Sequence, residues 1–182
     1  DLGDYDRAFH CLQAAKRLKL AQVKPGQPDY DGVFSALMQL PAALDAADGA
    51  DSGEPIFVVG MPPTGTTLVE RILSSHSSVE SAGELANLST LVKQQLGTPS
   101  PWVLDQETLS RLDRLDYKRL GEDYLASTRH LTGSGVRFID KMPFNFMYIP
   151  VIARALPGAK IICLRRNPMD TCLSNYRQLF GV

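Results

Sequence analysis

The chain has 182 residues, of which 44% are hydrophobic, so it can bury one sizeable core, or one core with a small helical appendage. Nineteen Lys and Arg residues against twenty Asp and Glu residues give a formal net charge of -1. This balance argues against a globally basic nucleic-acid-binding protein or a polybasic membrane-surface protein, so any anion site must be local.

Residues 1–20 show the apolar spacing of an amphipathic helix, with Ala8, Leu12 and Leu18 on one stripe. The Gly-x-Tyr-x-x-Ala opening resembles the second helix of a tetratricopeptide repeat, although a single copy is equally typical of an ordinary amphipathic helix. We predict a tetratricopeptide-like helix over residues 1–22. Because half a repeat cannot bury its own face, either an upstream repeat array precedes it or it packs on the main domain.

Residues 23–53 are predicted to be a linker with short helices. Two prolines and a glycine interrupt residues 23–30. Asp31 is expected to cap a helix that Pro41 then interrupts before a further turn. Small polar residues at 48–54 mark the boundary to a core domain that occupies the rest of the chain, residues 54–182.

Within this core domain, apolar strands alternate with helices, which is typical of a parallel sheet covered by helices on both faces. Ligands in such sheets bind beyond the carboxyl ends of the strands. The predicted strands are residues 55–59, 80–82, 136–140 and 160–164, and the predicted helices are residues 66–75, 85–96, 105–131, 144–156 and 168–180.

Residues 60–67 read Gly-Met-Pro-Pro-Thr-Gly-Thr-Thr and join the first strand to the first helix. The two glycines have the spacing of the phosphate-binding loop G-x-x-x-x-G-K-[ST], whose backbone N–H groups hold a phosphate-like anion. Thr66 replaces the lysine that reaches the β- and γ-phosphates in nucleoside triphosphatases, which argues against ordinary ATP or GTP hydrolysis. The predicted fold class is therefore α/β, with a P-loop nucleoside-triphosphatase-like sheet after an N-terminal helical segment.

A second motif follows the last predicted strand. Arg166 ends this strand, Asn167 can cap a helix, and Pro168 suits the first helical position. Ser174 lies two turns along the helix on the same face, so a guanidinium group and a hydroxyl group can reach one phosphate from two directions.

These two motifs resemble those of the sulfotransferases. Residues 56–68 are similar to the 5′-phosphosulfate loop of that family, P-[RK]-[ST]-G-T-T, and Arg166 and Ser174 match a second signature, an arginine followed eight residues later by a serine. The chain resembles in particular the bacterial tetratricopeptide-repeat sulfotransferases, which are related to the protein-tyrosine sulfotransferases. The resemblance covers residues 55–182, and because relatives continue further, the core domain is expected to lack its C-terminal part.

The resemblance implies a donor, 3′-phosphoadenosine-5′-phosphosulfate (PAPS), and a transfer that needs no metal. Seven basic residues against two acids over residues 137–177 support a polyanionic ligand there. Pro63 stands where the family usually has Arg or Lys, which puts the catalytic rate in doubt more than the fold. The residues implied to bind the donor are Pro63, Thr64, Gly65, Thr66 and Thr67 at the 5′-phosphosulfate, and Arg166 and Ser174 at the 3′-phosphate.

Two further residues are implied to be catalytic. Glu84 resembles the general base of tyrosylprotein sulfotransferases, and Lys141 resembles a family lysine that contacts the transferred sulfate. From the residues alone, Glu84 is also a candidate helix-capping carboxylate, and Lys141 a surface lysine or a partner of Asp140. His76 is the competing base, because related cytosolic sulfotransferases use a histidine.

The leading hypothesis is a sulfotransferase acting on an acceptor hydroxyl of protein tyrosine, a carbohydrate or a small molecule. One alternative is a small-molecule P-loop kinase, for which Asp140 is the candidate magnesium-binding acid. Another is a repeat-linked interaction module, which binds a protein partner through upstream repeats and is catalytically impaired by Pro63.

Three cysteines are too few for a disulfide scaffold and lack metal-ligand spacing, and the apolar runs are shorter than the roughly 20 residues of a membrane-spanning helix. Residues 1–20 are charged, unlike a signal peptide. We therefore expect a cytoplasmic protein with no metal, membrane or nucleic-acid partner.

Overall fold

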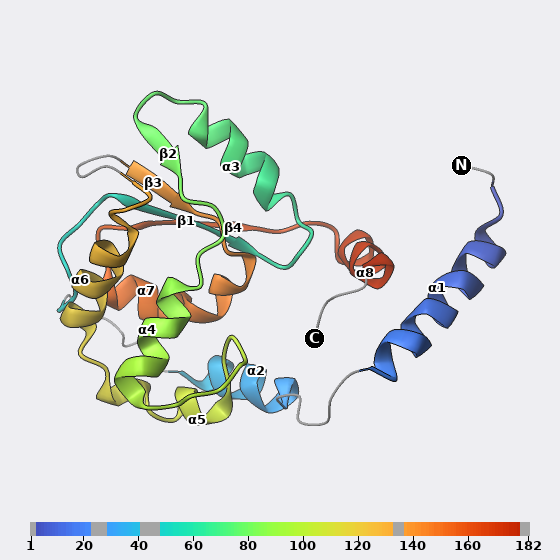
Figure 1. The fold of residues 1–182 in the computed structure, drawn as a ribbon, viewed down its shortest axis with the longest axis horizontal. Coiled ribbons are helices and arrows are strands. Elements are labelled where there is room, and N and C mark those ends of the chain that lie inside the picture. Colours follow the sequence, from blue (N-terminus) through green and yellow to red (C-terminus); the bar gives the residue numbers. More distant parts are fainter. Residues whose placement is uncertain (1–2, 23–28, 41–47, 133–136, 179–182) are drawn as a thin grey trace. The chain divides into compact units, whose positions relative to one another are not determined.

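The computed structural model describes residues 3–22, 29–40, 48–132 and 137–178 (Figure 1). These residues form two compact units, one from Asp1–Gln27 with Asn167–Val182 and the other from Pro28–Arg166. Each unit is described by itself below. The predicted turn before residue 48 lies outside the described residues.

The larger unit contains a four-stranded sheet with the order β2-β3-β1-β4, and every neighbouring pair is parallel. All six residues of β1 are buried, which explains why this strand is a continuous apolar run rather than an alternating one. The predicted parallel sheet is therefore confirmed. The strands are β1 (Pro55–Gly60), β2 (Val79–Ser81), β3 (Arg137–Asp140) and β4 (Lys160–Leu164).

Helices cover both faces of this sheet, as Figure 1 shows. On one face α3 (Thr66–Ser74) packs Val69 and Leu73 against Ile56 and Val58 of β1. The larger core lies on the other face and includes alternate residues of β1 together with buried side chains of the covering helices. These helices are α4 (Asn87–Leu96), α6 (Tyr117–Thr128) and α7 (Ile149–Ala155).

The single long helix predicted over residues 105–131 is wrong. The structure instead has α5 (Gln106–Leu109), the 3-10 helix η1 (Leu112–Arg114) and then α6. Leu115 is extended, with φ of -68° and ψ of 134°, and the Asp116 carboxylate accepts a hydrogen bond from the backbone N–H of Arg119 at 3.0 Å. The apolar spacing continues through this turn because the leucines before and after it enter the same core.

Two other predicted helices also differ from the structure. The segment predicted as one helix over residues 144–156 begins with the 3-10 helix η2 (Pro143–Tyr148) and only then becomes α7. The helix predicted to follow an Asp31 cap is α2 (Tyr30–Gln39), and Asp29 caps it by accepting a hydrogen bond from Gly32 N–H at 3.1 Å.

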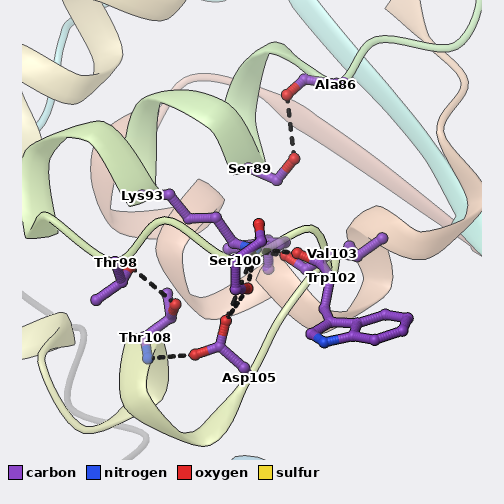
Figure 2. Close-up of polar contacts among 10 residues, drawn as sticks. Ala86, Ser89, Lys93, Thr98, Ser100, Trp102, Val103, Asp105 and Thr108 are labelled. Carbon is purple, nitrogen blue, oxygen red and sulfur yellow. Dashed lines mark hydrogen bonds and ion pairs between the residues drawn. The ribbon is translucent and has the colours of Figure 1, made fainter. Parts of the chain in front are cut away.

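A polar cluster fastens α4 to α5 (Figure 2). The Lys93 ammonium group donates to Ser100 Oγ at 2.8 Å and to the Trp102 carbonyl oxygen, and Asp105 accepts from Ser100 Oγ at 2.5 Å. Asp105 also caps α5 by accepting from the backbone N–H of Thr108 at 2.7 Å. Burial lowers the pKa of Lys93. The indole ring of Trp102 extends away from this cluster (Figure 2). The ion pair between Lys93 and Asp105, at 3.7 Å, links α4 to the N-cap of α5.

The smaller unit contains α1 (Tyr5–Leu20) and α8 (Pro168–Arg177). The Phe9 ring stacks on the Tyr176 ring with 5.7 Å between their centres. The predicted start of α8 is confirmed, because Asn167 Oδ1 accepts from the Met169 N–H at 2.9 Å and Pro168 is the first helical residue. None of the helices in the described ranges has both the length and the apolar character that crossing a membrane requires.

Candidate functional site

Residues 60–67 join β1 to α3, and we call them the phosphate loop. The conformation of this loop depends on two glycines. Gly60 has a φ of 151° and Gly65 a φ of 102°, values that favour glycine. A Cβ atom at Gly60 would lie 2.6 Å from the Leu164 carbonyl oxygen, because β1 and β4 end side by side, whereas one at Gly65 would meet nothing within 4 Å. The loop is therefore packed against β4 at its first glycine and open at its second.

The open side of the loop carries hydrogen-bond donors. Gly65 is the N-cap of α3, and no side chain caps this helix in the described structure, so its first backbone N–H groups are available to a ligand. The positive end of the helix dipole favours an anion at the same place. The hydroxyl oxygen of Thr64 is buried and has no hydrogen-bond partner among the described residues. This chemistry fits a phosphate or sulfate group.

Arg166 lies beside this loop. Residues 164 and 60 are paired in the register of β4 and β1, so the chain that follows β4 passes the loop. The Arg166 guanidinium group donates to the Pro63 carbonyl oxygen at 3.4 Å. The structure therefore brings Arg166, the side chain predicted for the 3′-phosphate, to the phosphate loop, although the two are 103 residues apart in sequence.

Ser174 lies on α8, in the smaller unit, and its side chain is half-buried. Asn167 begins the same helix two turns earlier, as the sequence predicted. Because each unit is described by itself, the approach of Ser174 to the phosphate site stays a prediction.

Glu84 and Lys141 are in direct contact. The Lys141 backbone N–H donates to the Gly83 carbonyl oxygen at 2.8 Å, which continues the parallel pairing of β2 and β3 past their carboxyl ends. The Lys141 ammonium group donates to Glu84 Oε1. Ala86 is the N-cap of α4, and no side-chain cap is formed there, so Glu84 does not act as the capping carboxylate considered above.

Glu70, a residue that the sequence analysis missed, completes this group. Its Oε2 atom lies 3.8 Å from the Lys141 nitrogen, and its Oε1 atom accepts a hydrogen bond from the Ser81 hydroxyl at 2.5 Å. The signal was present, because Glu70 follows Thr66 by four residues and shares the buried face of α3, where a carboxylate needs partners. We call Glu70, Ser81, Glu84 and Lys141 the Lys141 cluster.

The Lys141 cluster lies close to the phosphate loop along α3. Glu70 follows Thr66 by four residues, so about 6 Å along the helix axis separates the residue that ends the loop from the residue that pairs with Lys141. The Lys141 side chain is only 9% exposed, whereas that of Glu84 is 55% exposed. A buried cation and an accessible carboxylate thus lie together near the candidate anion site.

His76 lies away from this arrangement. It follows the last turn of α3, whereas the phosphate loop precedes the first, and nine helical residues between them span about 13 Å. Its ring Nδ1 atom accepts a hydrogen bond from the Ser78 N–H at 3.1 Å. The structure therefore places His76 in the turn before β2, at the amino end of that strand, whereas the loop and Lys141 follow the carboxyl ends of their strands.

Asp140 is buried beneath the site rather than in it. Its Oδ2 atom accepts hydrogen bonds from the Tyr124 hydroxyl at 2.7 Å and from the Asn145 amide at 3.3 Å. Burial raises the pKa of Asp140 to about 7 against the effect of these bonds. The described residues contain no group of three or more His, Cys, Asp and Glu side chains that could hold a metal ion. Lys141 pairs with Glu84 and Glu70 instead of serving as the partner of Asp140.

The site can bind an anion through backbone donors and place a cation and a carboxylate beside it. Group transfer from a phosphate-linked donor to a hydroxyl needs these three elements: a cradle, a cation for developing charge, and a base.

Comparison with known proteins gives several relatives. A protein of Aquifex aeolicus without an assigned function is 35% identical over 98% of this chain and 24% of its own length. A putative protein-tyrosine sulfotransferase of Caenorhabditis briggsae is 29% identical over 62% of this chain and 39% of its own length. A solved sulfotransferase of Mycobacterium avium matches 81% of this chain and 51% of its own, with a TM-score of 0.40 and 17% identity.

The chain thus spans well under half the length of these two curated relatives. The model of the sulfotransferase family matches residues 55–182, which contain the sheet, the phosphate loop and the Lys141 cluster. The chain therefore belongs to the sulfotransferase family, a family of transferase enzymes.

Proposed function

We propose that this protein transfers the sulfuryl group of PAPS to an acceptor hydroxyl by in-line displacement without a metal. The observation that carries the proposal is the contact between Lys141 and Glu84 next to a phosphate loop that lacks the nucleotide-hydrolysing lysine. Family membership supports the reaction class.

In this proposal the phosphate loop holds the 5′-phosphosulfate. The N–H groups at residues 64–67 and the dipole of α3 bind its oxygens, and Gly65 leaves room for the ligand to approach the backbone. Pro63 has no N–H group and no charge, so it contributes to the shape of the loop rather than to the binding of charge. Arg166 and Ser174 bind the 3′-phosphate, which distinguishes this donor from ATP.

The chemistry follows from the Lys141 cluster. Glu84 accepts the proton of the acceptor hydroxyl, and the acceptor oxygen forms a bond to sulfur as the bond from sulfur to the bridging phosphate oxygen breaks. The electron pair of the broken bond stays on that oxygen, so the product is 3′,5′-bisphosphoadenosine. Lys141 stabilises the charge that develops around the sulfuryl group.

The acceptor is proposed at the level of chemical class. Glu84 is more than half exposed, so a hydroxyl carried by a protein tyrosine, a carbohydrate or a small molecule can approach it from solvent. The name of the Caenorhabditis briggsae relative favours tyrosine. A protein acceptor could also contact upstream repeats, if α1 is the end of such an array.

The kinase alternative has less support in the geometry. A magnesium-binding acid must face the phosphates, whereas Asp140 is fully buried and accepts hydrogen bonds from Tyr124 and Asn145. Nucleotide binding measured by calorimetry separates the two functions. We expect 3′,5′-bisphosphoadenosine to bind without magnesium and more tightly than ATP with magnesium, and the reverse preference would favour the kinase.

Transfer itself is tested with labelled PAPS and three acceptors: a tyrosine peptide, an oligosaccharide and 4-nitrophenol. Sulfation of any of them supports the proposed reaction and identifies the acceptor class. If the interaction-module alternative is correct, neither nucleotide binding nor transfer is expected.

A further inference from the structure

Lys141 is held from two sides by carboxylates of very different exposure. Glu84 reaches it from the segment after β2, and its side chain is 55% exposed. Glu70 reaches it from α3, and its side chain is 12% exposed. The formal charge of the three groups is therefore -1, and one of the two negative charges lies inside the protein.

Glu84 accepts a hydrogen bond from Lys141, whereas Glu70 forms an ion pair with it at 3.8 Å, and the two carboxylates differ in what happens when they separate from Lys141. Glu84 can turn into solvent and recover its hydration there. Glu70 cannot, because its side chain is only 12% exposed and lies at the end of β2, where the Ser81 hydroxyl donates a hydrogen bond to it at 2.5 Å. Removing one partner of a buried ion pair leaves an uncompensated charge, which is strongly unfavourable. The contact between Glu70 and Lys141 is therefore the one that persists.

The proposed reaction requires such an asymmetry. Glu84 loses its negative charge when it accepts the proton of the acceptor, so its attraction for Lys141 weakens at the time when Lys141 is needed at the sulfuryl group. The lysine side chain is flexible, with four rotatable methylene groups, and would lose its position if Glu84 alone held it. A second carboxylate on a rigid helix provides the fixed attachment.

We propose that Glu70 is a positioning residue, which holds the Lys141 ammonium group from inside the protein. The ammonium group then keeps its position when its contact with Glu84 is lost. This inference rests on the proposed function for its role in the reaction, but the attachment itself is a property of the free protein. Glu70 does not touch the donor in this proposal and acts through Lys141.

The attachment is tested by NMR of the full chain labelled with 15N-lysine. Ammonium protons that are hydrogen-bonded and shielded from water exchange slowly enough to be observed, whereas those of mobile surface lysines do not. Lys141→Arg assigns the signal. We expect the Lys141 signal to persist in Glu84→Gln and to disappear in Glu70→Gln, two variants that remove the same charge and keep nearly the same volume.

Every other pattern overturns the proposal. A signal that persists in both variants means that Glu70 is not needed, and one that is lost in both means that Glu70 is not sufficient. No signal in the unmodified protein means that Lys141 is not held. If Glu70→Gln does not fold, Glu70→Asp withdraws the charge by one methylene group and should weaken the signal more than Glu84→Asp does, and the converse would contradict the proposal.

The role in the reaction is tested separately by single-turnover transfer from PAPS. Glu70→Gln should slow transfer by roughly tenfold or more, because small displacements of a reacting group have effects of this size, while the affinity for 3′,5′-bisphosphoadenosine stays unchanged. The exposed Glu122→Gln is the control and should leave both unchanged. An equal loss of nucleotide affinity in Glu70→Gln would indicate a general structural role instead.

Failure of the proposed function would give a different experimental result from failure of the Glu70 proposal. In that case the unmodified chain does not bind 3′,5′-bisphosphoadenosine or transfer sulfate, and the NMR variants still decide whether Glu70 holds Lys141.

Discussion

The phosphate loop and the Lys141 cluster are neighbours along α3, and they are built from different parts of the chain. The loop presents backbone N–H groups, and its two glycines are required for its conformation and its open side. The cluster consists of four side chains from three segments, with Lys141 and Glu84 57 residues apart. A backbone site tolerates side-chain changes that a side-chain site cannot, so donor binding and catalysis should respond differently to substitution.

The largest expected effect comes from Lys141→Ala. Arg166 also contacts the loop, at the Pro63 carbonyl oxygen, but with Pro63 in place of the usual basic residue Lys141 is the cation that we propose for the sulfuryl group. Removing it takes away the charge that stabilises the transition state, so transfer should nearly cease while 3′,5′-bisphosphoadenosine still binds. Single-turnover kinetics and calorimetry measure the two quantities. Substantial remaining transfer would mean that another cation serves the sulfuryl group.

Glu84→Gln should have the next largest effect. The amide keeps the shape of the side chain but cannot accept the acceptor's proton, so turnover should fall by roughly a hundredfold or more at unchanged donor affinity. His76→Ala is the matched test of the competing base, and it should leave turnover nearly unchanged, because His76 lies at the other end of α3. The reverse result would exchange the two roles.

Pro63→Arg tests the loop from the opposite direction, by adding what it lacks. A guanidinium group at this position would restore a donor and a charge near the bridging oxygen, and a single preorganised donor of this kind is worth up to about a hundredfold in rate. We expect faster single-turnover transfer at unchanged donor affinity. Tighter donor binding with no gain in rate would show that position 63 acts in the ground state, and the separation of binding from catalysis would then be wrong.

The sequence was sufficient for the elements that local patterns specify. The apolar run at β1 was predicted to within one residue and the Asn-Pro start of α8 where it occurs, because burial on both faces and helix capping leave direct marks on neighbouring residues. The break at Leu115 was missed, because the leucine spacing is maintained by the core on both sides of the turn.

The site was predicted in part. Glu84 and Lys141 could each be assigned to the end of a strand, but their contact depends on β2 lying next to β3, and the order of strands is a tertiary property that periodicity does not contain. Glu70 was predicted only as part of the helix over residues 66–75. Its place in the site was missed, because its two partners come from other segments of the chain. The positions of Gly60 and Gly65 in the turn from β1 to α3 could be predicted, since the glycine spacing is local.

The smallest expected effect concerns Arg166. Its side chain contacts the backbone of the phosphate loop at the Pro63 carbonyl oxygen, so it combines features of the backbone site and of the side-chain site. If its guanidinium group also binds the 3′-phosphate, a charged hydrogen bond worth about 1.5–3 kcal/mol is lost in Arg166→Ala, and 3′,5′-bisphosphoadenosine should bind roughly tenfold more weakly or worse. Adenosine 5′-phosphate lacks the 3′-phosphate, so its affinity should hardly change, and Ser174→Ala should give the same selectivity with a smaller loss. Calorimetry with both nucleotides provides the comparison. Equal losses for the two nucleotides would mean that Arg166 acts by holding the loop in shape, and the 3′-phosphate would then need other partners.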